Sequence, residues 1–490
     1  MSKKVSIEYF RSKGLLPFQV EFAAKFLQSE EKRYWQLVSP VGAGKTRLAG
    51  AIIAHELEIR GEKRFLVLCP ALLLNQWQSE ISNMVSSKAE GSTPIIVDRK
   101  TYLEFESRVP VGQSPWPSVA IILMSIDLAK KENMVRNLTG IVWDLVIIDE
   151  SHLLIGKRKG LFKHLVDSEV MSHCLLLTAT PSHKFEGVVT KVVNRREIFD
   201  WNGQAIYPSF KKVLTTLEFE RPKEEKDFLT AVEKFAYEFA ILKTYGKFQS
   251  LILLRIACSS MYSLEGSLRR LLASWRSLRN KIAHSIPWTN EDLETAQQEL
   301  AGGIDEVEAL EEIPEGITVQ PEKFLNLYQK LEGLINRLEE IRTDSKLNCL
   351  LSYVKKSIQD DGKEYLCIWT SFRNTVEYLY SCIQELDIPV YILTGSLNVN
   401  ERANNLNLFR QNGGILISTD ALLEGVSLEF VDESINYDLP IDPTKLEQRW
   451  GRFLRVGRKS EFRMVFMRDK SKSLIWEEKL FETLENAMKA

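Results

Sequence analysis

The 490-residue chain lacks the hallmarks of disulfide-bonded, secreted and membrane-spanning proteins. Its six cysteines are scattered and form no CxxC pair, which argues against a zinc ribbon or a disulfide scaffold and fits a reduced environment. The longest apolar run, Phe65 to Leu74, contains Pro70 and is about half as long as a membrane span. The opening segment, MSKKVSIEYF, has no apolar signal core. We therefore expect a soluble cytoplasmic protein with no membrane partner.

An excess of charge of one sign is also missing, because 64 Lys and Arg residues balance 66 Asp and Glu residues. This balance argues against a globally basic, histone-like nucleic-acid binder but leaves room for local basic patches. Residues 243–281 contain eight basic residues and one acidic residue, 291–322 contain eleven acidic residues and no basic one, and 445–472 contain ten basic residues against three acidic. We interpret 291–322 as a flexible solvated insertion, with nucleic-acid mimicry or autoinhibition as the alternative.

Two series of short apolar runs alternate with helix-length segments and predict two α/β regions on either side of a helical one. Runs that are apolar throughout are typical of parallel sheets covered on both faces. The expected strands are 35–39, 64–69, 119–124, 145–149 and 174–178 in the first series, and 365–370, 390–393, 414–418, 434–437 and 463–466 in the second. The predicted domains are 1–215, a helical insertion at 216–340, and 341–490 with a C-terminal helix.

The strongest local motif is the segment from Ser39 to Thr46, SPVGAGKT, which lies between an expected strand and an apolar helix. Glycines let backbone N–H groups approach phosphates closely, and the N-terminus of the following helix adds a favourable dipole. In such a loop Lys45 contacts the β- and γ-phosphates, and the Thr46 hydroxyl binds Mg²⁺. We therefore predict an ATP site that contains Gly42, Ala43, Gly44, Lys45 and Thr46.

A second motif, VIIDESH, ends an apolar strand in two carboxylates, Asp149 and Glu150. The carboxyl end of a parallel strand is the edge at which α/β proteins bind ligands. We expect Asp149 to hold Mg²⁺, and Glu150 to orient and polarise an attacking water as a general base. A solvated strand end is the alternative for this motif alone, and the glycine loop makes the catalytic interpretation the better one.

These two motifs together resemble superfamily 2 helicases and translocases of the DExH kind. Further segments resemble that family's motifs in the same order: 16–19, 69–77, 125–127, 178–181, 368–372, 418–425 and 448–455. The resemblance implies an α/β fold of two RecA-like parallel-sheet lobes in tandem, with a helical insertion between them. It also implies that Gln19 reads adenine. The residues that would couple the ATP state to lobe closure are His152, Thr178, Thr180 and Gly425.

Three arginines, Arg449, Arg452 and Arg455, recur at three-residue spacing in the last of these segments, which places them near one face of a helix. A guanidinium group binds phosphate oxygens through a fork of donors and does not deprotonate. The resemblance implies that Arg452 and Arg455 are arginine fingers and that Gln448 belongs to the nucleotide site. A solvated basic helix face is the alternative.

The segments 194–197, 206–208 and 221–226 resemble Swi/Snf-type ATPases of the bacterial, RapA-like branch. Members of this family grip backbone phosphates of duplex DNA, which implies little sequence readout and strong salt dependence. The nucleic-acid contacts that we expect are Gln76, Ser125, Ser371 and Thr419. Trp77 and Trp275 are interpreted as core residues, with base stacking as the alternative.

The expected function is that of an ATP- and Mg²⁺-dependent motor that moves along double-stranded DNA. The expected partners are duplex DNA and proteins that supply an effector activity, in a bacterial defence or DNA-processing complex. Two alternatives remain open: a strand-separating DNA or RNA helicase, and a regulatory ATPase switch or scaffold subunit of a multiprotein complex.

Overall fold

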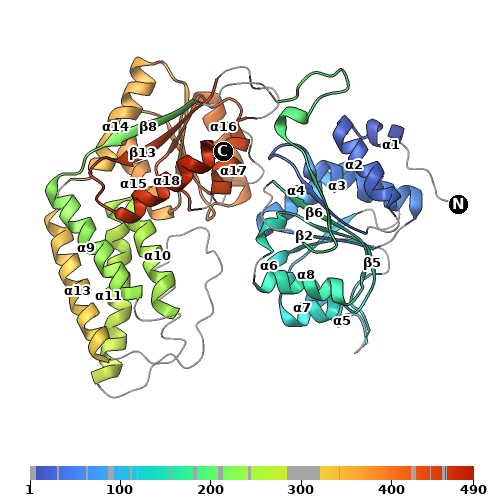
Figure 1. The fold of residues 1–490 in the computed structure, drawn as a ribbon, viewed down its shortest axis with the longest axis horizontal. Coiled ribbons are helices and arrows are strands. Elements are labelled where there is room, and N and C mark those ends of the chain that lie inside the picture. Colours follow the sequence, from blue (N-terminus) through green and yellow to red (C-terminus); the bar gives the residue numbers. More distant parts are fainter. Residues whose placement is uncertain are drawn as a thin grey trace. The chain divides into compact units, whose positions relative to one another are not determined.

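The computed structural model contains two compact units, formed by residues 1–209 with 454–457, and by residues 210–453 with 458–490 (Figure 1). The described residues are 7–29, 33–61, 64–86, 93–110, 113–117, 120–154, 156–179, 185–207, 213–240, 244–283, 321–341, 343–420, 426, 428–441, 443–454, 458 and 461–489. Among these residues, no helix is both long enough and apolar enough to span a bilayer.

The first unit is built on a parallel sheet. Its strands are β1 (Tyr34–Val38), β2 (Arg64–Cys69), β3 (Pro94–Val97), β4 (Ala120–Ser125), β5 (Trp143–Ile148), β6 (Met171–Thr178) and β7 (Val189–Val192). Their order across the sheet is β3-β4-β2-β5-β6-β1-β7. Because β6 pairs in parallel with both β5 and β1, the loop after β1 and the loop after β5 lie at the same carboxyl edge, where ligands bind in α/β folds.

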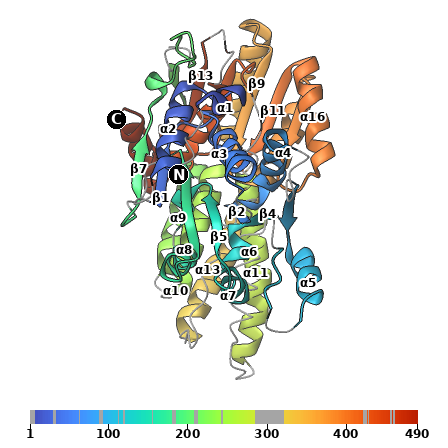
Figure 2. The same ribbon diagram turned by 90° about the vertical axis from the view of Figure 1, so that its right-hand side faces the viewer.

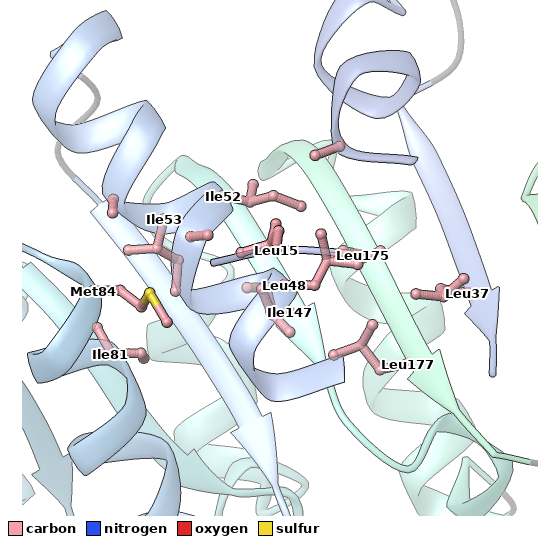
Figure 3. Packing of buried hydrophobic residues seen from close by; sticks show 14 of the residues in the cluster. Leu15, Leu37, Leu48, Ile52, Ile53, Ile81, Met84, Ile147, Leu175 and Leu177 are labelled. Atoms are coloured by element: carbon pink, nitrogen blue, oxygen red, sulfur yellow. The ribbon is translucent and has the colours of Figure 1, made fainter. Parts of the chain in front are cut away.

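Alternating side chains of the first sheet pack against helices on opposite faces. In β2, Phe65 and Val67 belong to one core cluster, whereas Leu66 and Leu68 belong to the other. The first face carries α1 (Ile7–Ser12), α2 (Pro17–Gln28), α3 (Lys45–His55) and α4 (Leu74–Met84), and the second carries α5 (Arg99–Ser107), α6 (Ile126–Ala129), α7 (Glu132–Leu138) and α8 (Lys157–Asp167) (Figure 2). Figure 3 shows residues of α3 and α4 packed over β5 and β6. Both faces are therefore buried, as the apolar strands predicted.

The second unit also contains a parallel sheet. Its strands are β8 (Val213–Phe219), β9 (Tyr365–Thr370), β10 (Val390–Leu393), β11 (Gly414–Thr419), β12 (Glu433–Asn436) and β13 (Arg463–Asp469). Their order is β10-β11-β9-β12-β13-β8. The helices associated with this sheet are α14 (Ser345–Lys355), α15 (Arg373–Gln384), α16 (Val399–Asn412), α17 (Pro443–Phe453) and α18 (Ile475–Lys489). Within this group, α14 and α15 share a core cluster with the strands.

A helical bundle extends from this second sheet (Figure 1). Its helices are α9 (Lys223–Ala240), α10 (Thr244–Ser259), α11 (Met261–Ala283) and α13 (Pro321–Glu340), which share one core cluster. Asp438, just after β12, ties the bundle to the sheet, because its Oδ2 accepts hydrogen bonds from Ser259 Oγ at 2.9 Å and from the Ser371 N–H at 2.9 Å. The bundle belongs to the second unit.

The fold class predicted from the sequence is confirmed, and every expected strand is present within a few residues of its expected bounds. The domain boundary at 215 is wrong, because residues 213–215 begin β8 and pair with β13 of the second sheet. Strands β3, β7 and β8 were not expected from the sequence. All three are edge strands, and β7 and β8 expose residues along their length, so neither forms a continuous apolar run. The expected acidic insertion ends earlier than 322, since α13 begins at Pro321, and the remainder lies outside the described residues.

Candidate nucleotide site

The glycine loop lies where the sequence predicted it, between the end of β1 and the start of α3. Gly42 and Gly44 have φ values of 82° and 76°, in the left-handed region that residues with a Cβ rarely adopt. A Cβ on Gly44 would lie 2.7 Å from Gln19 Nε2. The loop leads directly into α3, whose N-terminus favours an anion. The local geometry therefore suits a phosphate.

Gln19, on α2, forms hydrogen bonds with the backbone carbonyls of the glycine loop. Its Nε2 donates to the carbonyl oxygens of Ala43 at 2.9 Å and Gly44 at 3.0 Å, and its Oε1 accepts the Leu16 N–H at 2.8 Å. Both ends of this buried side chain are therefore bonded to the chain itself. The adenine-reading role of Gln19 remains a prediction, and the structure adds a loop-holding role that the sequence did not reveal.

Two further donors bind the carbonyl side of the same loop. Lys45 Nζ donates to the Ser39 oxygen at 2.9 Å and the Pro40 oxygen at 3.3 Å, and Tyr207 Oη donates to the Val41 oxygen at 3.3 Å. These bonds fix the orientation of the loop's peptide groups. In this state the Lys45 ammonium is held at the loop, where a nucleotide phosphate would compete for it.

Asp149 follows β5 and is 5% exposed. Its Oδ1 accepts the Glu150 N–H at 2.8 Å, and its Oδ2 accepts the indole N–H of Trp77 at 3.0 Å. Burial, followed by the nearby Glu150 charge, raises the pKa of Asp149 to about 6, although Lys45 and the two hydrogen bonds act in the opposite direction. The carboxylate is thus a site that favours a cation.

The residues present fit Mg²⁺. This ion prefers oxygen ligands and is held in nucleotide sites by few protein groups together with phosphates and waters. The Asp149 carboxylate supplies hard oxygens in a buried position that favours protonation, and a bound divalent cation would relieve that cost. Thr46, in the first turn of α3, is the second ligand that the sequence predicts.

A short polar chain runs from Glu150 to β6. His152 Nδ1 lies 3.2 Å from Glu150 Oε2 and 3.1 Å from Thr178 Oγ1. Glu150 itself has φ 48°, a strained conformation for a residue with a side chain. The sequence predicted Glu150 as the base and His152 and Thr178 as coupling residues, and the structure brings these three together.

Gln36 is a buried polar residue in the middle of β1 that the sequence analysis missed. Its Nε2 donates to Ser151 Oγ at 3.2 Å, and its Oε1 accepts from Thr190 Oγ1 on β7 at 3.2 Å. A glutamine in an otherwise apolar strand is the signal that could have identified it, because a buried amide requires partners. Gln36 links the segment after β5 to the edge strand β7.

In the second unit, Arg449 on α17 is completely buried. Its Nε and Nη2 donate to Asp420 Oδ1 and Oδ2 at 2.6 and 2.8 Å, and its Nη1 donates to Asn436 Oδ1 at 2.6 Å. Its guanidinium also lies over the Trp369 ring at 5.5 Å. Arg449 therefore joins α17 to the ends of β11 and β12, which excludes the solvated basic face as an interpretation of this residue.

The comparisons with known proteins cover most of the chain. Residues 12–183 match the family model "Type III restriction enzyme, res subunit", and residues 345–457 match "Helicase conserved C-terminal domain". The chain is 27% identical over 473 residues to an uncharacterized ATP-dependent helicase, YqhH, of Bacillus subtilis, covering 94% of this chain and 76% of YqhH. It belongs to superfamily 2 of the helicases. Members of this superfamily are ATP hydrolases, and Lys45, Asp149 and Glu150, which the sequence predicts for that reaction, lie at one edge of the first sheet.

This superfamily 2 helicase also resembles the RNA polymerase-associated protein RapA. It is 23% identical to the Vibrio campbellii protein over 491 residues and 24% identical to that of Vibrio cholerae over 492 residues. These matches cover 94% and 91% of this chain but 49% and 47% of the RapA chains, so this helicase spans about half the length of RapA. The RapA-like, Swi/Snf-type assignment made from the sequence is confirmed.

The helicase domain of Pyrococcus furiosus Hef has a similar fold, with a TM-score of 0.52 at 14% sequence identity, covering 96% of this chain and 98% of that one. This likeness concerns the fold alone and supports two RecA-like lobes.

The remaining predicted residues of this helicase differ in their surroundings. Arg452, in the last turn of α17, is 7% exposed, and Gln448 is half-buried. Arg455, Thr180 and Gly425 lie outside the described residues. The roles of these residues as fingers, nucleotide contacts or coupling residues remain predictions.

Of the predicted nucleic-acid contacts, Gln76 is exposed, while Ser371 and Thr419 are buried. Ser125 caps α6, because its Oγ accepts the Leu128 N–H at 3.1 Å. Trp77 and Trp275 are buried in core clusters, which confirms the core interpretation and makes base stacking wrong for both. Gln76 thus has the most exposed side chain of the four predicted nucleic-acid contacts.

Proposed function

We propose that this helicase-family ATPase is a motor that couples ATP hydrolysis to movement along double-stranded DNA. The observation that supports it most is the arrangement at one sheet edge of the first unit. There the glycine loop with Lys45, the buried Asp149 and the Glu150–His152–Thr178 chain follow neighbouring strands. Lys45 and Thr46 bind the phosphates and Mg²⁺, and Glu150 directs the attacking water.

Mg²⁺, when bound, neutralises phosphate charge as the terminal phosphoryl group is transferred to water. The chain's own groups do the rest. Lys45 exchanges its bonds with the Ser39 and Pro40 carbonyls for phosphate oxygens. Glu150 takes up the proton of the attacking water, and its neighbour His152 carries the change in hydrogen bonding to Thr178. Arg452 and Arg455 serve as arginine fingers.

Duplex DNA is the proposed track, with Gln76 at the start of α4 and Ser125, Ser371 and Thr419 at the ends of β4, β9 and β11 as contacts, although the Ser371 and Thr419 side chains are buried in this structure. The helical bundle adds basic side chains from 243–281, among which Arg269, Arg276 and Arg279 are exposed. Contacts of this kind go to phosphates and carry no sequence readout, so binding should weaken steeply with salt. We also propose that partner proteins supply an effector activity in a bacterial defence or DNA-processing complex.

The substrate is tested by ATPase rates measured in parallel with duplex DNA, single-stranded DNA and RNA. The proposal predicts the greatest stimulation by duplex DNA, with displacement of a triplex-forming third strand and no separation of a forked duplex. Separation of the fork would instead identify a strand-separating helicase. A rate unchanged by every nucleic acid would contradict the motor and identify a regulatory switch or scaffold subunit.

A further inference from the structure

Trp77, on α4, forms a hydrogen bond with Asp149, the predicted metal-binding carboxylate that follows β5. It lies on α4, is completely buried, and donates its indole N–H to Asp149 Oδ2 at 3.0 Å. The other oxygen of Asp149 is held at 2.8 Å by the N–H of the next residue, Glu150. The carboxylate is therefore oriented from two sides, once by its own chain segment and once by a helix of the covering layer.

Other buried tryptophans of the first unit use a different kind of acceptor. Trp143 donates its indole N–H to the Leu138 carbonyl at 3.0 Å, and Trp116 donates to the Asn137 carbonyl at 3.0 Å. A backbone carbonyl is fixed by the peptide plane, whereas a carboxylate turns about its own side-chain bond. A donor on Oδ2 therefore decides which lone pairs of Asp149 remain for a ligand.

The same helix begins at the surface. In the first turn of α4, Asn75 and Gln76 are exposed, and the next residue is the buried Trp77. Gln76 is the most accessible of the proposed nucleic-acid contacts. A ligand that displaces the start of α4 thus acts on a backbone segment that also carries the indole. Because interiors are close-packed, a shift of this segment moves the donor against Asp149.

We propose that Trp77 is a positioning residue for Asp149, and that it makes the Mg²⁺ affinity of the site respond to nucleic acid bound at the start of α4. The second half of this proposal rests on the proposed function, since it requires nucleic acid to bind there. The role of the indole is to fix the plane of the carboxylate, so that the lone pairs not used by the indole and the Glu150 N–H are directed at the metal.

The first test is equilibrium binding of ADP to the full chain, measured calorimetrically with and without Mg²⁺. Trp77→Phe removes the donor, and Trp143→Phe is the matched control, because it removes an indole bond to a carbonyl in the same unit. We expect Trp77→Phe to weaken the Mg²⁺-dependent gain in ADP affinity about tenfold or more. Affinity without Mg²⁺ should change little, and Trp143→Phe should behave as the wild type. Equal Mg²⁺-dependent gains in all three proteins would overturn the positioning role.

A second variant separates hydrogen bonding from packing. In Trp77→His, the imidazole Nε2 occupies the ring position of the indole Nε1, so a donor remains although the six-membered ring is lost. Positioning predicts that His retains more Mg²⁺-dependent affinity than Phe, whereas a packing role predicts the reverse order, because Phe fills more of the space. The calorimetric stoichiometry gives the fraction of protein molecules that bind ADP. A partly unfolded variant therefore shows fewer ADP-binding sites, while the affinity of its folded fraction can still be measured.

The second test repeats the Mg²⁺ titrations with a duplex oligonucleotide present. We expect DNA to tighten Mg²⁺–ADP binding in the wild type and in Trp143→Phe, and to have no such effect in Trp77→Phe. A Trp77→Phe protein that is weakened but responds to DNA by the same factor as the wild type would overturn the coupling. If DNA does not bind the wild type at all, the failure lies with the proposed function, and the comparison without DNA still decides the positioning role.

Discussion

Asp149 is a buried carboxylate whose surroundings favour its protonated form, because burial and the neighbouring Glu150 outweigh Lys45 and two hydrogen bonds. At the scale of single residues, the ligand-free site is therefore costly for the fold and favourable for a cation. Gly44 constrains the site in a different way, since its left-handed conformation and its closeness to Gln19 tolerate no side chain. The buried Asp149 charge is the unfavourable feature that a bound cation can relieve.

Asp149→Asn should abolish Mg²⁺-dependent ATP hydrolysis and remove the cost of the buried charge, although its amide oxygen can accept only one of the two N–H groups that Asp149 holds. The pKa of Asp149 is raised from 3.8 to about 6, so the cost of its charge is fully present above pH 6 and is lost as the pH falls toward 3.8. Two pKa units correspond to about 3 kcal/mol in the free energy of unfolding. Urea unfolding at pH 7.5 and pH 4.5 measures the stability of the variant relative to the wild type, which should be more favourable to the variant at pH 7.5. A relative stability that is the same at both pH values would contradict this account.

Gly44→Ala should destabilise the fold and eliminate nucleotide binding. A left-handed conformation costs a residue with a Cβ about 1–2 kcal/mol, and the new methyl group would lie 2.7 Å from Gln19 Nε2. Gly61→Ala is the control, because Gly61 has φ 74° but a methyl group there would meet no atom within 4 Å. Thermal unfolding should show a loss for both variants, and ADP binding a loss for Gly44→Ala alone. Normal ADP affinity in Gly44→Ala would refute the role given to this loop.

At the scale of secondary-structure elements, apolar runs determine most of what was predictable. The central strands and the glycine loop were found from the sequence because β2, β5 and β9 are continuous and buried, and because the loop requires glycine at Gly42 and Gly44. The edge strand β8 was not, since its alternating exposure depends on pairing with a strand far along the chain. Contacts such as Trp77 to Asp149 depend in the same way on distant residues meeting, which no local spacing reveals.

Arg449 is the central tie between α17 and the ends of β11 and β12, and its loss should be severe. Arg449→Met leaves Asp420 buried without its partner, which costs about 3–5 kcal/mol. Adding Asp420→Asn should recover much of that loss, because the uncompensated charge is removed. Urea unfolding of the single and double variants checks both statements.

An exposed pair provides the control for that experiment. Arg269 on α11 contacts Glu339 on α13 at 2.8 Å with both side chains about half exposed, so Arg269→Met should cost less than about 1 kcal/mol. Similar losses for Arg449→Met and Arg269→Met would mean that Arg449 is not the structural tie described.

At the scale of the whole molecule, the predicted phosphate loop, metal-binding carboxylate and base lie in one unit, and the sequence that matches the helicase C-terminal family lies mostly in the other, with buried arginines. This division is the reason why ATP hydrolysis and movement are proposed to be coupled through both units. The near-zero net charge gives no information about the nucleic acid that is bound, because the basic segments 243–281 and 445–472 are offset by the acidic segment 291–322.

The most direct measurement is the rate of ATP hydrolysis by purified wild type and Glu150→Gln, with and without duplex DNA. The substitution removes the base while keeping a side chain of the same size beside His152. The account predicts that duplex DNA stimulates the wild type and that Glu150→Gln, folded by circular dichroism and still binding ADP, loses the DNA-stimulated rate by at least about a hundredfold. Hydrolysis retained by Glu150→Gln at the wild-type rate would contradict the account.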